Sequence, residues 1–521
     1  MFASQKPAIM TSLEPSYKSG LRPFPAGYWS PELLNWAWSG NCPYYPKAGP
    51  PIGALTDLPE FGAEKRQVLQ SVLMRQMQSL DLSVAQKEHL QALNLPNSYT
   101  VCTGQQIHIG GGPLFVWAKI SSTLAWAKSI QSQNPGMRVV PVFWMATEDH
   151  DFDEIKGLNL WGKHYELSGE KGGPVGRISA DELKALKAAI ISDFPHLSEA
   201  LSQYWQAFDP ATDLADAYRR LIHRHFAETG LLILDPDDSE LKKMAMPLWE
   251  QELGSGLLSQ AFSSANSKLL QAGQPAPAHV RDVNAFWLGE DTRQRIEECQ
   301  SLEIIHERVS EISPNVLLRP LYQQAILPNL AYIAGPTEFR YWFQTTEAFA
   351  QFQLHMPQLL LREAWLELPQ SVWKKLHSWQ LSLADMGLPE SEFQSLLTGK
   401  LSESMSEWEV IQRELVQLEE RGSQMLYIAQ NPSLKDFKKD LNSAQKRWRD
   451  AFESEKQKGL ESLYGKGAEE KMKEYRQRYF NWKLPVERKL NVLEWYMQDS
   501  ERGLPEANAL EYLTLGAFRI L

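Results

Sequence analysis

Cysteine, positive charge and long apolar runs are all scarce in this chain of 521 residues. Its three cysteines show no CxxC spacing, which indicates neither a disulfide framework nor a zinc knuckle and suits a reducing cytoplasm. The net charge of -11 argues against a protein that coats nucleic acid, because such a protein carries a basic face. No apolar stretch approaches the roughly 20 residues of a membrane span, and the N-terminal segment lacks the apolar centre of a secretory signal. We therefore expect a soluble cytoplasmic protein with neither nucleic acid nor membrane as a partner.

The stretch from Tyr99 to Asp153 has the pattern of a β-α-β unit. The apolar run Val101–Thr103 leads into a glycine-rich turn, a helical segment follows, and a second apolar run, Val139–Met145, closes the unit. Both faces of the second run are apolar, which fits a strand buried in a parallel sheet between helices. Another apolar run, Leu231–Leu234, also ends in an acid. This alternation predicts an α/β fold, a Rossmann-like doubly wound parallel sheet.

Composition divides the chain into a core, an arm and a final segment. Residues 1–390 form the predicted core, with inserted connecting segments near 155–210 and 270–310. Residues 391–484 are charged with a sparse apolar stripe, which predicts a C-terminal α-helical coiled-coil arm. Antiparallel helices of one chain could cover that stripe, or a second subunit could. Residues 485–521 are expected to return to the core.

The turn from Gly104 to Gly112 suits an anion. It leads to Pro113, a residue favoured at the start of a helix, so backbone N–H groups and the positive end of the helix dipole face the turn. The segment His108-Ile109-Gly110-Gly111 is comparable with the H-I-G-H signature of class I aminoacyl-tRNA synthetases, although Gly111 replaces the second histidine. A tight turn without any ligand is the alternative. The candidate nucleotide or substrate contacts here are Thr103, Gly104, Gln105, Gln106, His108, Gly110, Gly111 and Gly112.

Charged residues crowd the end of the second strand, where an open α/β sheet binds its ligands. They are Glu148, Asp149, His150, Asp151 and Asp153. The carboxylates could hold an ammonium group or sugar hydroxyls, bind Mg²⁺, or fix the tautomer of a basic His150. We expect Asp149, His150 and Asp151 to be catalytic, with Glu148 and Asp153 binding substrate. A solvated loop whose acids cap the next helix is the alternative.

Three blocks in order over about half the chain carry a family resemblance. The first two are Gly104-Gln105-Gln106 with Gly112-Pro113, and Pro141-Val142-Phe143-Trp144 with the acidic cluster. The third comprises Ser313-Pro314-Asn315, Arg319-Pro320, Pro328, Tyr332-Ile333-Ala334-Gly335-Pro336, Glu338 and Tyr341-Trp342. Together they resemble the bacillithiol biosynthesis cysteine-adding enzymes.

The resemblance implies a ligase that joins L-cysteine to the glucosamine amine of glucosaminyl malate, the last step of bacillithiol biosynthesis. It also implies a homodimer through the coiled-coil arm. It adds Asn315, Arg319, Gly335 and Glu338 as substrate-binding residues. Arg319 could make a bidentate contact with a carboxylate or phosphate, or form a structural Arg–Glu pair. Lys119 is expected to make a surface or helix contact.

Joining a free carboxylate to an amine in water is uphill, so the cysteine carboxyl must be activated. By analogy with synthetases that have similar turns, ATP or ADP is the expected cofactor, with Mg²⁺ as a candidate and no resident metal site. The glycine turn would hold phosphates, the acidic cluster would receive the amine and its proton, and Arg319 would orient a carboxylate. Two other functions stay open: a nucleotidyltransferase or adenylate-forming enzyme acting on another amine, and a non-catalytic dimeric scaffold.

Overall fold

The fold is taken from a computed structural model of the full chain. It describes residues 31–39, 42–49, 57–169, 172–206, 208–366, 370–404, 414, 416–417, 420–421, 424, 435–480, 486–489, 491–498 and 518–520. The chain divides into two compact units. Of the described residues, those within 32–365 and 487–519 belong to the first unit, and Pro31, those within 366–486 and Ile520 belong to the second.

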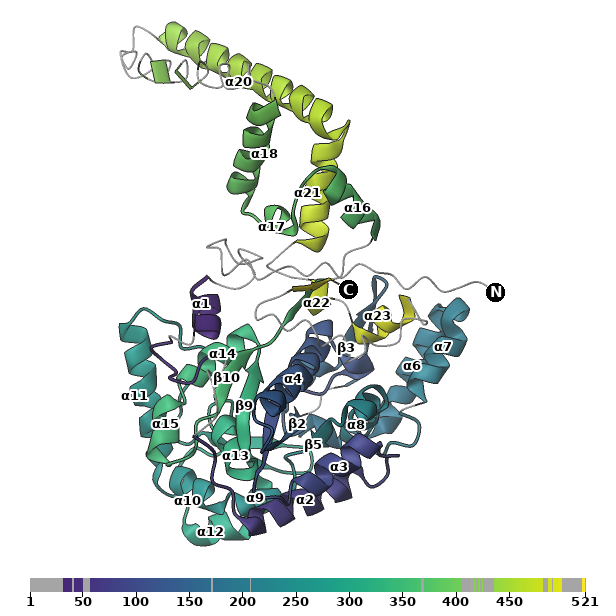
Figure 1. The fold of residues 1–521 in the computed structure, drawn as a ribbon, viewed down its shortest axis with the longest axis vertical. Helices are drawn as coiled ribbons and strands as arrows, with labels where there is room; N and C mark the ends of the chain where they lie inside the picture. Colours follow the sequence, from purple (N-terminus) through teal and green to yellow (C-terminus); the bar gives the residue numbers. More distant parts are fainter. Residues whose placement is uncertain are drawn as a thin grey trace. The chain divides into compact units, whose positions relative to one another are not determined.

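A parallel five-stranded sheet forms the centre of the first unit (Figure 1). Its strand order is β10-β9-β1-β2-β5, and every neighbouring pair is parallel. The strands are β1 (Ser98–Gln105), β2 (Arg138–Met145), β5 (Leu232–Leu234), β9 (Asn329–Ala334) and β10 (Gln358–Leu361). The predicted Rossmann-like parallel sheet is therefore confirmed.

The order of the strands creates a switch point beside β1. From β1 the chain moves to one side, through β2 to β5, and it later returns to the other side for β9 and β10. Loops that leave β1 and β9 thus diverge and open a crevice at the carboxyl ends of these strands. Helix α4 (Leu114–Gln133) follows β1 and packs on the sheet, where Trp126 and Ile130 bury against Val101 and Val139.

Other helices of the first unit surround the sheet (Figure 1). Before β1 lie α1 (Pro31–Ser39), α2 (Ala63–Met77) and α3 (Val84–Ala92), and α8 (Leu214–Phe226) precedes β5. After β5 come α9 (Ser239–Met244), α10 (Met246–Ser255), α11 (Leu257–Gln271), α12 (Leu302–Glu307) and α13 (Arg319–Ile326). Around β10 lie α14 (Pro336–Phe343), α15 (Thr346–Gln351) and β11 (Ala364–Leu366), and nearer the C-terminus are α22 (Val486–Lys489), α23 (Val492–Gln498) and β12 (Phe518–Ile520).

Two connections carry small structures of their own. The connection after β2 holds α5 (Phe152–Ile155), the hairpin of β3 (Gly157–Leu160) and β4 (Lys163–Glu166), α6 (Leu183–Asp193) and α7 (Ser198–Trp205). The later connection holds a three-stranded antiparallel sheet in the order β7-β6-β8. Its strands are β6 (Ala285–Leu288), β7 (Arg293–Arg295) and β8 (Ile312–Pro314).

The second unit is helical in its described residues. It contains α16 (Gln370–Ser378), α17 (Leu383–Met386), α18 (Glu390–Ser404), α20 (Lys435–Tyr464) and α21 (Ala468–Tyr479). Leu401 and Leu460 are buried where α18 meets α20. Along the predicted seam of α20, Ala444 is half-buried and Trp448 is 38% exposed, while the side chains of Leu434, Phe437 and Leu441 lie outside the described residues. The coiled coil stays a prediction.

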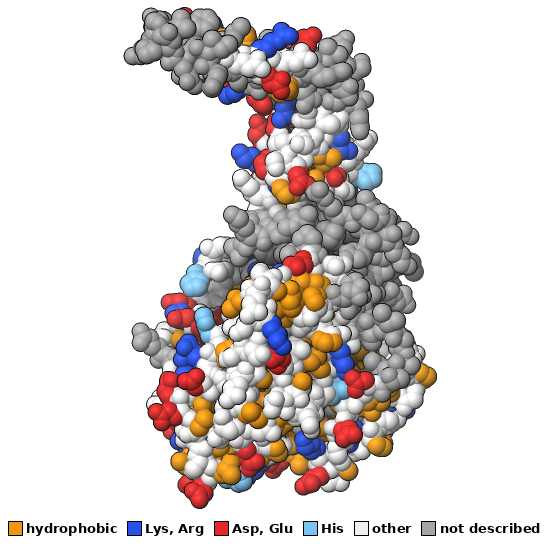
Figure 2. All heavy atoms as spheres, turned by 90° about the vertical axis from the view of Figure 1, so that its left-hand side faces the viewer, with side chains coloured by type: hydrophobic (Ala, Val, Ile, Leu, Met, Phe, Trp, Pro, Cys, Tyr) orange, Lys and Arg blue, Asp and Glu red, His pale blue; other side chains and the backbone are white. Residues whose placement is uncertain are grey.

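Surface charge is mixed where it is described. On the face shown in Figure 2, Lys and Arg side chains are interspersed with Asp and Glu. Within the part of the chain that the structure covers, every helix is too short or too polar to cross a bilayer.

Candidate active site

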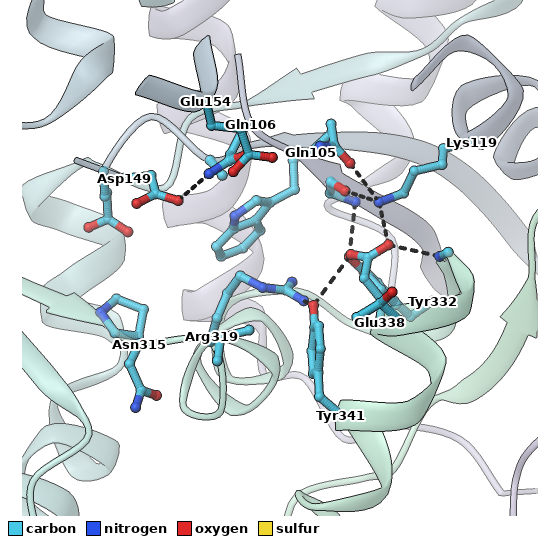
Figure 3. A pocket seen from close by; sticks show the side chains of 18 of the residues that line it. Gln105, Gln106, Lys119, Asp149, Glu154, Asn315, Arg319, Tyr332, Glu338 and Tyr341 are labelled. Carbon is cyan, nitrogen blue, oxygen red and sulfur yellow. Dashed lines mark hydrogen bonds and ion pairs between the residues drawn. The ribbon is translucent and has the colours of Figure 1, made fainter. Parts of the chain in front are cut away.

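A cavity of about 630 Å³ lies at the switch point, at the carboxyl ends of β1, β2 and β9 (Figure 3). Because these strands are parallel neighbours, the segments that follow them meet there: Gly104 to Gln106, Glu148 with Asp149, and Gly335 to Glu338. The cavity brings together residues predicted from all three sequence blocks. They are Gly104, Gln105, Gln106, Glu148, Asp149, Asn315, Arg319, Gly335 and Glu338.

The second half of the glycine turn does not line this cavity, contrary to our expectation. The hydroxyl of Tyr204 donates to the carbonyl of Gly110 at 3.2 Å, and that of Tyr218 donates to Gly111 at 3.3 Å. The backbone N–H of Val492, at the start of α23, donates to the Gly112 carbonyl at 2.8 Å. These contacts turn the carbonyls of the segment toward α7, α8 and α23. Phosphate binding by these glycines stays a prediction.

His108 and Thr103 also lie outside the cavity. His108 is half-buried, and burial lowers the pKa of its imidazole to about 4. It lies beside a small apolar space with Ile107, Leu183 and Tyr218. The Thr103 hydroxyl donates to the Ile333 carbonyl at 2.8 Å, which ties β1 to β9.

The acidic cluster divides into residues that face the cavity and residues that do not. Asp151 accepts a hydrogen bond from the Glu154 backbone at 3.1 Å and so caps α5. Asp153 pairs with Lys156 and is 84% exposed in its side chain. His150 is exposed, with Nδ1 3.1 Å from an Arg293 nitrogen. His150 and Asp151 do not line the cavity, and Asp151 fits the helix-cap alternative. Their catalytic role stays a prediction.

Asp149 lines the cavity but is already fully engaged. It accepts hydrogen bonds from Gln106 Nε2 at 2.6 Å and from the His150 backbone at 2.7 Å, and Arg293 lies 3.3 Å away. Burial by itself raises the pKa of this carboxyl, yet the hydrogen bonds of His150 and Gln106 and the charge of Arg293 hold it well below its usual value. Asp149 therefore stays ionised and is a poor proton acceptor.

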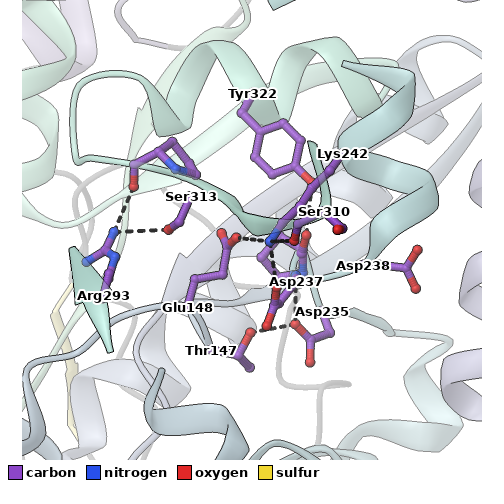
Figure 4. Close-up of polar contacts among 12 residues, drawn as sticks. Thr147, Glu148, Asp235, Asp237, Asp238, Lys242, Arg293, Ser310, Ser313 and Tyr322 are labelled. Atoms are coloured by element: carbon purple, nitrogen blue, oxygen red, sulfur yellow. Dashed lines mark hydrogen bonds and ion pairs between the residues drawn. The ribbon is translucent and has the colours of Figure 1, made fainter. Parts of the chain in front are cut away.

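Glu148 sits deeper than Asp149 and is 6% exposed. Its Oε1 lies 3.0 Å from Nζ of Lys242, a fully buried ammonium that also contacts Asp237 Oδ1 at 2.6 Å (Figure 4). Burial is the main reason that the pKa of Glu148 is raised to about 7, and the negative charge of Asp237 adds to it. The charges of Lys242 and Arg293 oppose that rise.

Lys119 is buried in the cavity wall instead of making the expected surface or helix contact. Its ammonium contacts Glu338 Oε2 at 2.5 Å, Gln105 Oε1 at 3.2 Å and the Gly104 carbonyl (Figure 3). Glu338 also accepts from the Gly335 backbone at 2.8 Å and from the Tyr332 hydroxyl at 2.8 Å. Burial opposes ionisation of Glu338, but the charges of Lys119 and Arg319 hold its pKa below the usual value.

Three arginines extend this side of the cavity. Arg319 donates to the Tyr341 hydroxyl at 2.8 Å and to Gln323 at 3.1 Å, so its contacts are to neutral groups and not to an acid as in a structural Arg–Glu pair. Arg362 and Arg488 each lie 5.6 Å from the ring of Phe115. Burial, together with the nearby charge of Arg488, lowers the pKa of Arg362 to about 9.

The cavity is therefore divided by charge. We call Lys119, Arg319, Arg362 and Arg488 the basic wall, which contains the single acid Glu338. We call Glu148, Asp149 and Glu154 the acidic wall, which Arg293 backs. Figure 3 shows Asp149 and Glu154 on one side and Lys119 and Glu338 on the other. Such a site can hold a carboxylate or phosphate at one wall and an ammonium group at the other.

Sequence reasoning missed five charged residues of the lining, Lys119, Glu154, Arg293, Arg362 and Arg488. One of them had a usable signal: Arg362 comes directly after β10, where the strand-end rule applies. Among the described residues, no cluster of three or more His, Cys, Asp or Glu side chains could hold a metal ion.

A doubly wound parallel sheet with a charged cavity at its switch point defines the class: a Rossmann-like protein with a small-molecule site. The model of the family "Bacillithiol biosynthesis BshC, N-terminal Rossmann-like domain" matches residues 54–363, and the chain belongs to this family.

Relatives across several bacteria carry the name "Putative cysteine ligase BshC". The protein of Flavobacterium johnsoniae is 30% identical over 423 residues, which cover 74% of this chain and 79% of the relative. That of Cytophaga hutchinsonii is 29% identical, over 64% of this chain and 66% of the relative. That of Salinibacter ruber is 33% identical, over 61% of this chain and 64% of the relative. These names support an enzyme of the ligase class.

Proposed function

We propose that this protein is a cysteine ligase that joins L-cysteine to the glucosamine amine of glucosaminyl malate, the last step of bacillithiol biosynthesis. The observation that carries the proposal is the charge division of the cavity, because both reactants combine amines with carboxylates. Family membership supports the same reaction. A volume of about 630 Å³ falls within the range of small-molecule sites, roughly 300–1,000 Å³.

In this proposal the basic wall holds carboxylates. Arg319, Arg362 and Arg488 orient the malate group or the cysteine carboxyl, since a planar guanidinium matches a carboxylate with two hydrogen bonds. The acidic wall receives the sugar ammonium, and Asp149, held ionised by its neighbours, contributes a fixed negative charge. The amine and the acyl carbon then approach each other across the cavity.

Activation of the cysteine carboxyl by ATP, with Mg²⁺, belongs to the proposal as well. The basic wall fits phosphate groups, and when bound a nucleotide supplies the leaving group that makes amide formation favourable. The glycines 110–112 are engaged in packing contacts, so we assign phosphate binding to the four cations instead. Mg²⁺ would arrive with the phosphates, because the described carboxylates form no metal cluster.

The test is synthesis of the thiol product by purified protein. L-cysteine, glucosaminyl malate, ATP and Mg²⁺ are combined and the product is measured by mass spectrometry, with each component omitted in turn. We expect product only in the complete mixture. Product that forms with a preformed cysteinyl donor but not with ATP would contradict activation by ATP. The proposal of a cysteine ligase would still hold. Absence of product with every donor would contradict the ligase.

The two other functions are separated by similar assays. Product from a different amine, in a screen of amino sugars, would favour an adenylate-forming enzyme or nucleotidyltransferase of other specificity. The charged cavity favours a small-molecule role over a scaffold. A homodimer through the arm and a cytoplasmic location are part of the proposal.

A further inference from the structure

Any amine that forms an amide must first lose a proton, and the cavity offers four carboxylates that could accept it. Asp149 is engaged by Gln106, His150 and Arg293. Glu338 is engaged by Lys119, Tyr332 and the Gly335 backbone. Glu154 is exposed to solvent. Glu148 alone combines burial with a place in the lining.

The surroundings of Glu148 are built from four elements. Lys242 comes from α9, Asp237 from the segment after β5, and Arg293 from β7. Tyr322 comes from α13; burial raises the pKa of its hydroxyl, and the nearby negative charge of Glu148 adds to that rise. Lys242 stands between two acids, with Nζ 3.0 Å from Glu148 and 2.6 Å from Asp237 (Figure 4).

Lys242 is shared between Glu148 and Asp237, and this arrangement affects the protonation of Glu148. A buried ammonium with one acidic partner would keep that partner ionised, because protonating the acid would leave a buried charge unpaired. Lys242 keeps Asp237 and the Ser310 carbonyl, at 3.1 Å, when Glu148 takes up a proton. Glu148 can therefore change its charge without leaving the buried Lys242 ammonium unpaired. Lys242 does not line the cavity itself.

We propose that Glu148 is the catalytic residue that accepts the proton of the substrate ammonium, and that Lys242 is its positioning residue. This inference rests on the proposed ligase function. One proton passes from the ammonium nitrogen to a Glu148 carboxylate oxygen, which leaves a neutral amine. That amine attacks the acyl carbon of a cysteinyl phosphate or adenylate, and the C–N bond forms as the C–O bond to the leaving group breaks. The second proton that the nitrogen loses leaves with the departing phosphate oxygen.

The pKa of about 7 that burial gives Glu148 fits this role, since a base works best when its pKa is near the working pH. The reaction rate should then rise with pH through about 7, as Glu148 loses its proton. The two partners of Glu148 pull in opposite directions: the charge of Lys242 lowers its pKa and that of Asp237 raises it.

The experiment is the pH dependence of kcat/KM for the full chain, with glucosaminyl malate and a saturating activated cysteine donor. Glu148→Gln should lower kcat by about 10²- to 10⁴-fold, the usual contribution of a general base. Lys242→Met should move the midpoint of the acidic limb to higher pH, and Asp237→Asn should move it to lower pH. The control Glu303→Gln, at an exposed glutamate outside the cavity, should keep the wild-type midpoint.

The opposed shifts separate this role from a structural one, because a loss of folding would lower rates without moving the midpoint in opposite directions. Melting curves by circular dichroism accompany each variant, and Glu148→Asp serves where Glu148→Gln folds poorly. If the wild type is active and Glu148→Gln keeps full activity and the same midpoint, the proposed role of Glu148 is wrong. The ligase proposal would not be affected by that result. A wild type inactive with every donor would overturn the ligase proposal, and this inference with it.

Discussion

The rule that ligands bind at the carboxyl ends of parallel strands identified segments that line the cavity. The direction of each side chain, however, depends on residues far away in the sequence. Glu148 and Asp149 were predicted because they follow a buried strand. Which of the nearby acids faces the cavity is decided by Arg293, more than a hundred residues later, which anchors Asp149. Lys119 was assigned to a surface or helix contact because its immediate neighbours do not reveal Glu338, its partner across the sheet.

The Lys119–Glu338 ion pair provides a test of stability. Lys119 is 1% exposed and Glu338 is 21% exposed in their side chains, so removal of the lysine leaves a mostly buried charge unpaired. Lys119→Met should cost about 3 kcal/mol of unfolding free energy. The double variant Lys119→Met with Glu338→Gln should recover most of this. Urea denaturation at pH 7 measures both, and equal losses in the two variants would contradict the pairing.

His108 predicts a pH dependence of stability. Its folded pKa of about 4 lies below the unfolded value of about 6.5, so the unfolded chain binds the proton first as pH falls. The stability that His108 contributes is present above pH 6.5 and is lost as pH falls toward 4. Because the residue is half-buried, we expect a loss of only about 1–2 kcal/mol from this group.

The comparison that isolates this histidine is His108→Gln, which removes the titrating group. Its unfolding free energy, measured between pH 7 and pH 4, should decline less steeply than that of the wild type. Parallel declines for the two proteins would mean that His108 does not carry the effect.

At the scale of elements, the β-α-β unit was predictable because two apolar runs and a helix have clear periodicity. The glycine turn was not, since its role depends on contacts with α7, α8 and α23. The glycines were interpreted as a cradle for phosphate, which stays a prediction; their positive φ lets the turn approach Tyr204 and Val492 closely. Local sequence does not distinguish a turn that faces a ligand from a turn that faces a helix.

Gly111→Ala distinguishes these two roles. Gly111 has a φ of +87°, and an added Cβ would lie 2.9 Å from the Tyr204 hydroxyl and 3.2 Å from Val492. We expect a loss of about 3 kcal/mol in thermal or urea unfolding. Gly136→Ala is the control, because nothing lies within 4 Å of its added Cβ. Lost activity with unchanged stability in Gly111→Ala would return the turn to ligand binding.

For the whole molecule, the sequence predicted a sheet-bearing core and a helical arm, but it did not say what covers the arm. Helix α20 runs from Lys435 to Tyr464, and its seam residue Trp448 is 38% exposed. An exposed tryptophan on an apolar stripe suits a contact with a second copy.

The homodimer prediction is tested by sedimentation of the full chain. Wild-type protein at micromolar concentration should sediment as a dimer, and Trp448→Glu should weaken the association by about tenfold or more. Because association itself stabilises the folded state, the melting temperatures are compared at a concentration where both proteins are monomeric, and there they should be similar. A wild type that sediments as a monomer across this concentration range would exclude the dimer.

The late position of Arg488 in the sequence has a consequence for how the protein is made. Gly104 and Arg488 are separated by most of the chain yet border the same cavity. A ribosome can complete all five central strands well before it reaches Arg488, so the nascent chain holds a finished scaffold with one wall still open. Catalytic competence would thus arrive only once Arg488 has been added, and any chain that stops before this residue would lack one cation of the site.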